Sequence, residues 1–418
     1  MRFVHAADLH LDSPLRGLAH RDGAPVDRIR EATRRALENL IQLCLEEEAA
    51  CLLLAGDIYD GDWKDYGTGL FFASQLGRLR EAGTRVLLVR GNHDAASEIS
   101  RGLPLPGHVH ELPSKGPETV LLEDLGLAVH GQSFARRAVT DDLASGYPEA
   151  VAGYLNVGLL HTCLDGREGH DPYAPTSLGT LRGKGYDYWA LGHVHKREVL
   201  SEDPWVVFPG NLQGRHARET GPKGATVVTA EDQRITDVVH RPLDVVRWAR
   251  LEVDAGDADS AETVMERTRA DLEAAVEAAE GRLVAARVTV TGESAAHDAL
   301  LRDAERWENA IRAIAYDVDD LWVEKIRLRT RAPIDRAELA TRDDAIGQLF
   351  RSLRDLRGDE EAVAALGTHF AELEKKLPRE AREGDDGVRL NDPAYLREAL
   401  EDVERLLLPR VLGPAEGT

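Results

Sequence analysis

The chain of 418 residues has little cysteine and no long apolar run. Its three cysteines, Cys44, Cys51 and Cys163, form no CxxC pair, and an odd number without a secretion signal argues for reduced thiols. The opening stretch MRFVHAADLH turns polar too early for a signal peptide. The longest apolar runs, such as residues 51–55, are far shorter than a membrane span. We therefore expect a cytoplasmic protein without a membrane partner.

Positive charge is also scarce. The chain has 52 lysines and arginines against 74 aspartates and glutamates, a formal net charge of −22. Such a field repels nucleic acid at long range, so a DNA or RNA substrate would require bound metals, a basic patch or a partner subunit. The sequence contains no internal repeat and no low-complexity segment. Its length exceeds what one hydrophobic core usually supports, which predicts two or three domains.

Residues 1–245 alternate short apolar runs with helical stretches. We predict strands at residues 2–6, 50–55, 86–89, 127–130, 157–160, 188–191 and 205–208, and helices at 26–48 and 69–82. Strands separated by helices imply βαβ units, so the predicted fold class is α/β with a layered core.

The predicted pattern of strands and helices changes after residue 245. A smaller α+β module is predicted at residues 246–332, with strands at 250–253, 283–290 and 322–328 and helices at 261–279 and 295–315. Its first helix opens with Asp259 and Glu262, a start that resembles a capping box. The last region, residues 333–418, is predicted to form charged helices at 335–356, 360–377 and 393–408, with a loop at 383–387. Such helices bury little alone, so they pack either on a partner or on their own chain.

Side chains that bind metals or transfer protons follow the predicted strands of the first domain. The motifs are ADLH with Asp8 and His10, AGDIYD with Asp57, GNHD with Asn92 and His93, LLHT with His161, and LGHVH with His193 and His195. A turn, a helix cap or a hydrogen-bonded histidine would explain any one of them. Because open α/β sheets bind ligands at the carboxyl ends of strands, five such clusters together predict one site.

The residue types indicate the chemistry of this site. Imidazole, carboxylate and one amide oxygen, without thiolate, suit a hard or borderline divalent ion and not a structural zinc cage. For Cys163, two residues after His161, a small buried thiol is favoured over a ligand. Seven candidate ligands are too many for one ion and natural for two that share a carboxylate. Two metals about 3.5 to 4 Å apart clamp a phosphate and lower the pKa of a shared water, which predicts phosphoester hydrolysis.

The series DxH, GDxxD, GNHD, H and GHxH resembles the calcineurin-like metallophosphoesterase superfamily. The stretches HAADLHLDSPL, AGDIYDGDW, GHVHKREV and PGNLQGRHARETGPKG are similar to the SbcD/Mre family of DNA-repair exonucleases, in its bacterial branch of YhaO-type proteins. The resemblance implies a layered metallophosphoesterase sandwich with a smaller α+β capping domain and C-terminal helices. In the family those helices bind an SMC-like ATPase.

The resemblance also implies a role for each residue of the series. Asp8, His10 and His195 would hold one metal, Asn92, His161 and His193 the other, and Asp57 would be shared. Mn²⁺ is the expected ion, with Fe²⁺ or Zn²⁺ as alternatives. His93 would protonate or stabilise the leaving oxygen after attack of the activated water.

One residue departs from the nuclease pattern. Where nucleases of the family carry a histidine three residues after the shared aspartate, this chain has Asp60, as phosphatases of the superfamily do. Asp60 would orient His93 and raise its pKa by proximity, or it is an ordinary turn residue. The missing histidine is a phosphate contact in the nucleases, so this substitution weakens the inference to DNA.

Two basic segments are candidates for contact with a phosphodiester backbone. One contains Arg215, His216, Arg218 and Lys223, and the other, residues 325–331, has three arginines around a strand. Segments that only face solvent and bind no phosphodiester would have the same composition. The leading expectation is a DNA exonuclease in repair, with DNA, an SMC-like ATPase and a second copy of the chain as partners. The alternatives are a phosphatase or phosphodiesterase for small nucleotides or other phosphoesters, and a structural subunit whose C-terminal helices carry the function.

Overall fold

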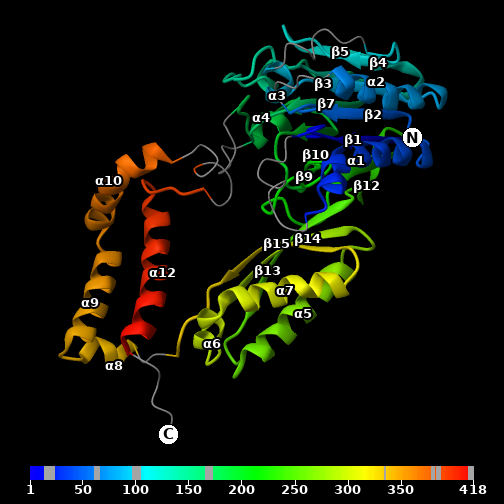
Figure 1. Cartoon of the computed structure of the whole chain (residues 1–418). Helices are drawn as coiled ribbons and strands as arrows, with labels where there is room; N and C mark the ends of the chain where they lie inside the picture. Colours follow the sequence, from blue (N-terminus) through cyan, green and yellow to red (C-terminus); the bar gives the residue numbers. More distant parts are fainter. Residues whose placement is uncertain are drawn as a thin grey trace. The chain divides into compact units, whose positions relative to one another are not determined.

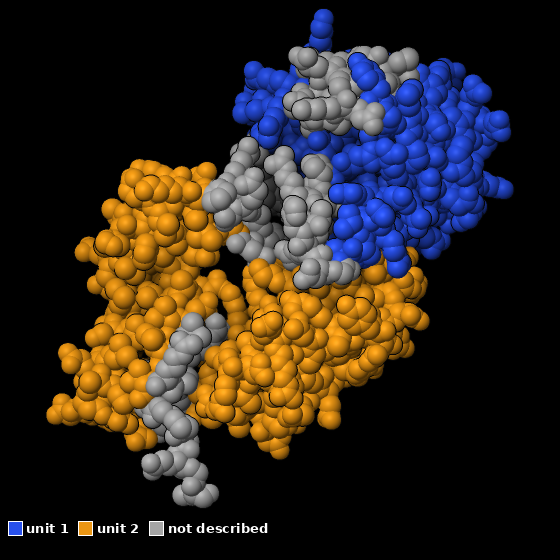
Figure 2. All heavy atoms as spheres, viewed as in Figure 1, with its two compact units in different colours: residues 1–248 blue, residues 249–418 orange. Residues whose placement is uncertain are grey.

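The computed structural model describes residues 1–13, 24–60, 66–96, 105–164, 173–333, 336–377, 382 and 387–412. The chain divides into two compact units, Met1–Trp248 and Ala249–Thr418 (Figure 2). This division lies beside the predicted boundary at residues 245 and 246, whereas the further boundary at residues 332 and 333 stays a prediction. No helix within the described ranges is long and apolar enough to cross a membrane.

Unit 1 contains two mixed six-stranded sheets, with the orders β12-β11-β1-β2-β3-β4 and β5-β6-β7-β8-β10-β9. The strands are β1 (Arg2–Ala6), β2 (Cys51–Ala55), β3 (Arg85–Val89), β4 (Val109–Glu111), β5 (Glu118–Leu122), β6 (Leu127–Gly131), β7 (Leu155–His161), β8 (Tyr188–Gly192), β9 (Glu198–Glu202), β10 (Trp205–Phe208), β11 (Gly224–Glu231) and β12 (Arg234–Pro242). Strands β1 to β4 run parallel, as do β6, β7, β8 and β10. Strands β5, β9, β11 and β12 pair antiparallel with their neighbours.

The two sheets pack face to face and share one hydrophobic core. Leu53 and Val89 of the first sheet belong to the same buried cluster as Val157 and Leu159 of the second. Helices α1 (Val26–Glu46) and α2 (Tyr66–Glu81) cover the outer face of the first sheet, and α4 (Leu178–Gly183) packs on the second (Figure 1). Helices therefore cover both sides of a two-sheet sandwich, which confirms the predicted fold class.

Strand β1 shows how the sequence places the site. Its side chains alternate between the two faces of the sheet, so Phe3 packs between the sheets while Val4 packs under the helices. Both faces are buried from Phe3 onward, and this part of the strand is apolar apart from His5; Ala7 and Asp8 follow it directly. The isolated bridges Ala7 to Asn211 and Leu11 to Tyr59 continue this alignment past the end of the strand.

Unit 2 begins with a three-stranded sheet in the order β13-β14-β15. Its strands are β13 (Val246–Asp254), β14 (Leu283–Thr291) and β15 (Leu321–Leu328), and its helices are α5 (Ala261–Glu277), α6 (His297–Arg302) and α7 (Ala304–Asp317). Helices α5 and α7 lie on one face of the sheet, where Leu272 and Ile311 pack with Val288 and Ile326 (Figure 1).

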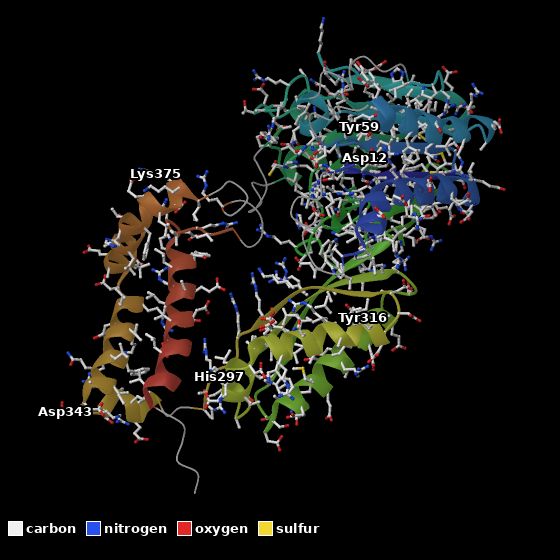
Figure 3. The ribbon with its side chains drawn as sticks, in the orientation of Figure 1. Asp12, Tyr59, His297, Tyr316, Asp343 and Lys375 are labelled. Carbon is white, nitrogen blue, oxygen red and sulfur yellow. The ribbon has the colours of Figure 1, made fainter. Side chains whose placement is uncertain are left out.

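Helices α8 (Arg336–Thr341), α9 (Ala345–Gly358), α10 (Glu360–Lys376) and α12 (Pro393–Leu412) complete unit 2. Both α9 and α10 contact α12, so these helices pack on their own chain. Figure 3 labels Asp343 just before α9 and Lys375 near the end of α10, with His297 and Tyr316 in the α+β part and Asp12 and Tyr59 in unit 1.

The structure corrects several predicted elements. The helix predicted at 295–315 is two helices, α6 and α7, interrupted at Asp303. The helix predicted at 335–356 is also two helices, α8 and α9. Asp344 caps the start of α9, since its side chain accepts a hydrogen bond from the backbone N–H of Gly347. Helix α5 is capped by Ser260, which accepts from the backbone N–H of Thr263 at 3.2 Å, and not by Asp259. Strands β4, β5, β9, β11 and β12 were not predicted. Residue 335 and residues 383–386 of the predicted loop lie outside the described part of the chain.

Candidate metal centre

The carboxyl ends of β1, β2, β3, β7 and β8 bring the predicted site residues together. Asp8 and His10 follow β1, and Asp57 and Asp60 follow β2. Asn92 and His93 begin α3 (Asn92–Ala96) directly after β3, His161 ends β7, and His193 and His195 follow β8. All nine lie in a continuous set of contacts that spans the end of both sheets, whereas the chemical role of each stays a prediction.

The backbone at this end of the sandwich adopts uncommon conformations. Asp8, His10, Asp57 and His193 have φ values of 52°, 43°, 50° and 103°, in the left-handed region that side chains with a Cβ rarely adopt. The N–H of Asp8 bonds to Gly56 O, and the N–H of His10 bonds to Asp57 O, each at 3.0 Å. Such conformations cost on the order of 1 kcal/mol or more each and cluster at functional sites, where the surroundings enforce them.

Gly91 is required by the close approach of β3 to Asp57. A Cβ on Gly91 would collide with the Asp57 carboxylate and would lie 2.8 Å from the ring carbon Cε1 of His161. The next residues are held by Asp94, which accepts from the backbone N–H of Gly91 at 3.0 Å and of Tyr59 at 3.0 Å. Asp94 thus ties the GNHD turn to the segment after β2.

Two clusters of potential ligands share Asp8. Asp8, His10 and His195 each offer one atom within 4.8 Å of the others, and so do Asp8, Asp57 and His161. Asp57 Oδ2 lies 3.9 Å from His10 Nε2 and 3.5 Å from His161 Nε2, between the predicted ligands of the two ions. Asp57 therefore lies close to predicted ligands of both ions, and its shared role stays a prediction.

Asn92 and His193, the other predicted ligands of the second ion, lie next to His161. Asn92 Oδ1 lies 3.0 Å from His161 Nε2. The ring centroid of His193 lies 5.1 Å from that of His161, and the His193 backbone N–H donates to Asp8 Oδ2 at 2.9 Å. Among the described residues, no three-residue cluster of carboxylates and imidazoles includes His193, so its ring lies beside the group.

The hydrogen bonds of two histidines fix where their lone pairs point. His161 Nδ1 lies 2.9 Å from the carbonyl oxygen of Ala55, which only accepts, so the proton must be on Nδ1. The bare Nε2 of His161 then faces the oxygen of Asn92, another acceptor. His195 Nδ1 likewise donates to Glu219 Oε1 at 2.7 Å, and its bare Nε2 faces His10 Nε2 at 3.1 Å. At His161 an acceptor therefore faces an acceptor in a buried site, which is the arrangement that a bound cation relieves.

The charges of the site agree with a cation at its centre. Burial, reinforced by the charge of Asp57, raises the pKa of the Asp8 carboxyl well above its ordinary value. Burial also lowers the pKa of His10 and of His161 to about 3, so both imidazoles are neutral at physiological pH. Neutral imidazole, carboxylate and amide oxygen are ligands for divalent ions such as Mn²⁺, Fe²⁺ and Zn²⁺, and the described residues fit two such ions.

Asp60 joins His10 and His93 in a third cluster. His93 Nδ1 lies 2.9 Å from Asp60 Oδ1, and Ser13 donates to Asp60 Oδ2 at 2.6 Å. Burial acts to lower the pKa of His93, but the hydrogen bond to Asp60 and the charges of Asp57 and Asp60 outweigh it and raise that pKa. Asp60 therefore contacts His93 in the manner the sequence predicts and is more than an ordinary turn residue.

Glu219 is the site residue that sequence reasoning missed. Besides His195, its carboxylate accepts from the backbone N–H of Arg215 at 2.7 Å and from Asn211 Nδ2 at 2.9 Å. Burial acts to raise the pKa of Glu219, but His195 and Arg215 hold it well below its ordinary value. Glu219 lies in a loop and not at the end of a strand, so the strand-end pattern does not mark it.

The basic segment after β10 turns partly inward. Arg215 lies 3.6 Å from Asp60 Oδ2 and 3.3 Å from Glu219 Oε1, and its side chain is only 15% exposed. Lys223 is also buried and donates to the carbonyl oxygen of His195 at 2.7 Å. Arg218 and His216 are exposed, so only part of this segment is a solvated surface.

Two parts of the chain match models of known protein families. Residues 1–197, which contain all nine predicted site residues, match the calcineurin-like phosphoesterase family. Residues 248–331 match the middle domain of metallophosphoesterase YhaO, and these residues include most of β13 and all of β14 and β15.

Part of the chain is similar to the uncharacterized metallophosphoesterase YhaO of Bacillus subtilis, of which it spans less than two thirds. The two are 38% identical over 262 residues, which are 62% of this chain and 64% of that protein. Among solved structures, a dimetal phosphatase from Danio rerio matches with 12% identity and a TM-score of 0.34, over 55% of this chain and 92% of that one. The assignment to DNA-repair exonucleases remains a prediction.

Proposed function

We propose that this protein is a metal-dependent phosphodiesterase that hydrolyses DNA, with Mn²⁺ as its ion and an SMC-like ATPase as its partner. The observation that carries the hydrolytic part is the bare imidazole nitrogen of His161, which faces the acceptor oxygen of Asn92 inside a buried group of carboxylates and imidazoles. Asp8, His10 and His195 would hold one ion, Asn92, His161 and His193 the other, and Asp57 both. When bound, the two ions supply Lewis acidity that activates a water and neutralises phosphate charge.

His93 supplies the proton for the leaving oxygen. Its side chain is 34% exposed, whereas His10 and His161 are buried, so among these three His93 is the imidazole that a substrate reaches. The Asp60 carboxylate orients the ring through Nδ1 and stabilises the imidazolium, which leaves Nε2 to donate. The backbone N–H of His93 also donates to Asp57 Oδ1 at 2.9 Å, which fixes the proton donor relative to the shared carboxylate.

A phosphatase or phosphodiesterase for small phosphoesters is the second candidate. It is favoured by Asp60, which occupies the position of a phosphate-contacting histidine in the related nucleases and instead contacts His93 and Arg215. The net charge of −22 points the same way, because it opposes the approach of a polyanion. DNA remains the leading candidate because of the nuclease-like stretches around the site and the second unit that follows it.

Parallel hydrolysis assays separate these functions. Wild type and Asp57→Asn are loaded with Mn²⁺ and given a labelled DNA duplex, a labelled single strand and bis-p-nitrophenyl phosphate. Cleavage of DNA that disappears in Asp57→Asn supports the nuclease. Turnover of the small ester alone, lost in the same variant, favours the small-substrate enzyme, and equal turnover by both proteins would contradict the metal centre itself.

A further inference from the structure

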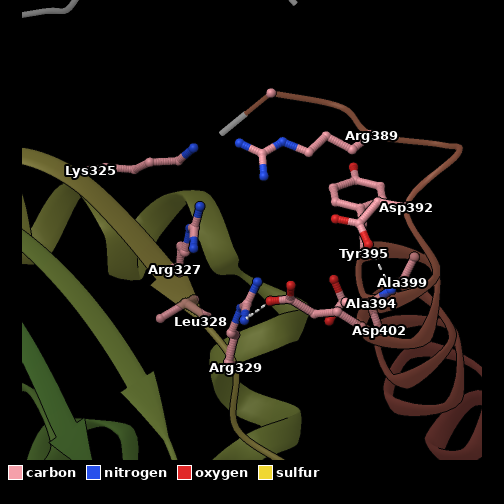
Figure 4. Close-up of a pocket in the computed structure, with 12 residues that line it drawn as sticks. Lys325, Arg327, Leu328, Arg329, Arg389, Asp392, Ala394, Tyr395, Ala399 and Asp402 are labelled. Atoms are coloured by element: carbon pink, nitrogen blue, oxygen red, sulfur yellow. Dashed lines mark hydrogen bonds and ion pairs between the residues drawn. The ribbon is translucent and has the colours of Figure 1, made fainter. Parts of the chain in front are cut away.

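A polar cavity of about 570 Å³ lies within unit 2, between β15 and the residues around the start of α12 (Figure 4). Its volume is in the range of small-molecule binding sites. Lys325, Arg327 and Arg329 line it from the strand side, and Arg389 and Tyr395 line it from the other. None of these residues belongs to the metal centre, so the cavity is a separate feature of the molecule.

A β-bulge turns the cationic side chains toward this cavity. Val323 pairs with Ala286, but the next pair joins Lys325 to Arg287, so Glu324 has no partner in the register of β14 and β15. The extra residue reverses the alternation of β15. Val323 faces the hydrophobic core before the bulge and Ile326 faces it afterwards, which sends Lys325 to the opposite face.

The bulge is held by a buried ion pair. Both carboxylate oxygens of Glu324 accept from Arg287, at 2.8 and 3.0 Å, and both side chains are almost fully buried. A two-point contact of this kind fixes the geometry of both residues. Lys325 and Arg327 consequently share one face of β15, two positions apart, and Arg329 follows at the same spacing.

Cations and carboxylates both line the cavity. Arg329 lines the cavity and is ion-paired with Glu398 of α12, which also lines it. Lys325, Arg327 and Arg389 extend into the same space (Figure 4). Three cations converging on one space provide the charge and the hydrogen-bond donors that a phosphate group requires.

We propose that this cavity binds a nucleoside monophosphate. The phosphate lies among Lys325, Arg327 and Arg389, and the ring of Tyr395 stacks on the base. Asp392 and Asp402, which also line the cavity, accept hydrogen bonds from the ribose hydroxyls or from an exocyclic amino group. Each part of such a ligand therefore meets a side chain of the matching chemistry.

A nucleic-acid polymer fits the same cavity poorly. A continuous phosphodiester chain would have to pass the carboxylates of Asp392, Glu398 and Asp402, and like charges at close range are repelled. The net charge of the chain opposes a polyanion further. A single phosphate at one end of a neutral ribose and base avoids this repulsion.

Equilibrium binding to the full chain tests the proposal. The protein is kept in EDTA, which prevents metal-dependent hydrolysis, and is titrated by calorimetry with AMP, GMP, adenosine and inorganic phosphate. We expect one saturable site per chain for AMP or GMP and weaker binding of adenosine and of phosphate. Absence of saturable binding by both nucleotides would overturn the proposal, as would phosphate binding as tightly as the nucleotides.

Variants locate the ligand within the cavity. Arg327→Ala and Lys325→Gln should each weaken nucleotide binding about tenfold or more, as loss of a charge-assisted hydrogen bond predicts. Tyr395→Leu should weaken nucleotide binding but leave phosphate binding unchanged. Arg269→Ala, which removes an exposed arginine paired with Asp317 outside the cavity, should change neither.

The variants also distinguish the proposed ligand from other occupants. Thermal unfolding identifies any of the three cavity variants that fails to fold. The affinities of the other two then decide whether the nucleotide binds in the cavity. Nucleotide affinity unchanged in all three folded cavity variants would overturn the proposal. Tight binding of a single-stranded oligonucleotide that the same variants abolish, with no binding of AMP or GMP, would overturn it in favour of a polymer site.

Discussion

Asp60 Oδ1 lies 2.9 Å from Nδ1 of His93, and this contact connects a carboxylate after β2 to an imidazole after β3. The carboxylate stabilises the protonated imidazole and directs its other nitrogen away from Asp60. In the proposed mechanism His93 therefore donates a proton, whereas the buried imidazoles of His10 and His161 are neutral and suited to bind metal.

Replacing His93 should therefore separate proton donation from metal binding. His93→Ala should retain both ions and lose about 10²- to 10⁴-fold in hydrolysis of a dinucleotide, whose alkoxide leaving group needs a proton. The loss on bis-p-nitrophenyl phosphate should be much smaller, because nitrophenolate leaves without one. Equal losses on the two substrates, or loss of bound metal, would contradict the role of His93.

Glu219 should act on the metal centre through His195. Glu219→Gln keeps the size of the side chain but removes the carboxylate that fixes the His195 ring, so metal affinity should fall about 10- to 100-fold. Titration of the metal-free protein with Mn²⁺, monitored by electron paramagnetic resonance, measures this directly. Glu202→Gln, an exposed glutamate at the end of β9, is the matched control. An unchanged affinity in Glu219→Gln would show that this carboxylate has no positioning role.

Two glycine variants should have opposite effects. Gly91→Ala places a methyl group against Asp57 and His161 in a buried turn and should cost about 1 to 3 kcal/mol of stability, together with weaker metal binding. Gly77→Ala, in α2, meets no atom within 4 Å and should stabilise the protein by roughly 1 kcal/mol. Urea unfolding of the metal-free proteins measures both. Stability equal to wild type in Gly91→Ala would contradict the close approach of β3 to Asp57.

His5 should make the metal-free protein less stable in acid. Burial lowers the pKa of His5 from 6.5 to about 3, and the ring lies 3.0 Å from the Tyr188 hydroxyl between the sheets. Between these two pH values the unfolded chain binds a proton that the folded chain excludes, so this residue costs on the order of 1 kcal/mol per unit as the pH falls. Above pH 6.5 it has no such effect.

The variant His5→Gln tests this dependence. It should be less stable than wild type at neutral pH, because its contacts with Tyr188 are imperfect, yet its stability should fall less steeply below pH 6. Urea unfolding in EDTA between pH 3 and pH 6.5 gives the slope of the unfolding free energy against pH for each protein. His10 and His161 contribute equally to the slopes of wild type and of His5→Gln. Parallel curves for the two proteins would contradict the neutral buried state of His5.

Much of the metal centre could be predicted because its residues directly follow apolar strands. Asp57 and His161 are marked by the runs that precede them, and parallel strands end at one edge of the sandwich. Glu219 could not be predicted in this way, since its place beside His195 depends on a loop that folds back after β10. The sequence also gives no sign that Arg215 turns inward to contact Asp60.

The elements that sequence reasoning misjudged depend on local interactions with weak periodic signals. Asp303 and Asp344 interrupt charged stretches whose helical pattern continues across them. The bulge at Glu324 could not be predicted from the sequence either, because one extra residue changes the face on which Lys325 lies without changing the composition of the strand. Side chains that a bulge redirects are found only when the register is known.

The most direct test of the metal centre combines metal counting with catalysis. Metal-free protein is titrated with Mn²⁺ while the bound metal per chain and the hydrolysis of bis-p-nitrophenyl phosphate are followed in the same samples. The arrangement of Asp8, Asp57 and their histidines predicts that activity rises with occupancy of two ions and is absent in EDTA. Full activity in EDTA, or with one bound ion per chain, would contradict a two-metal phosphoesterase.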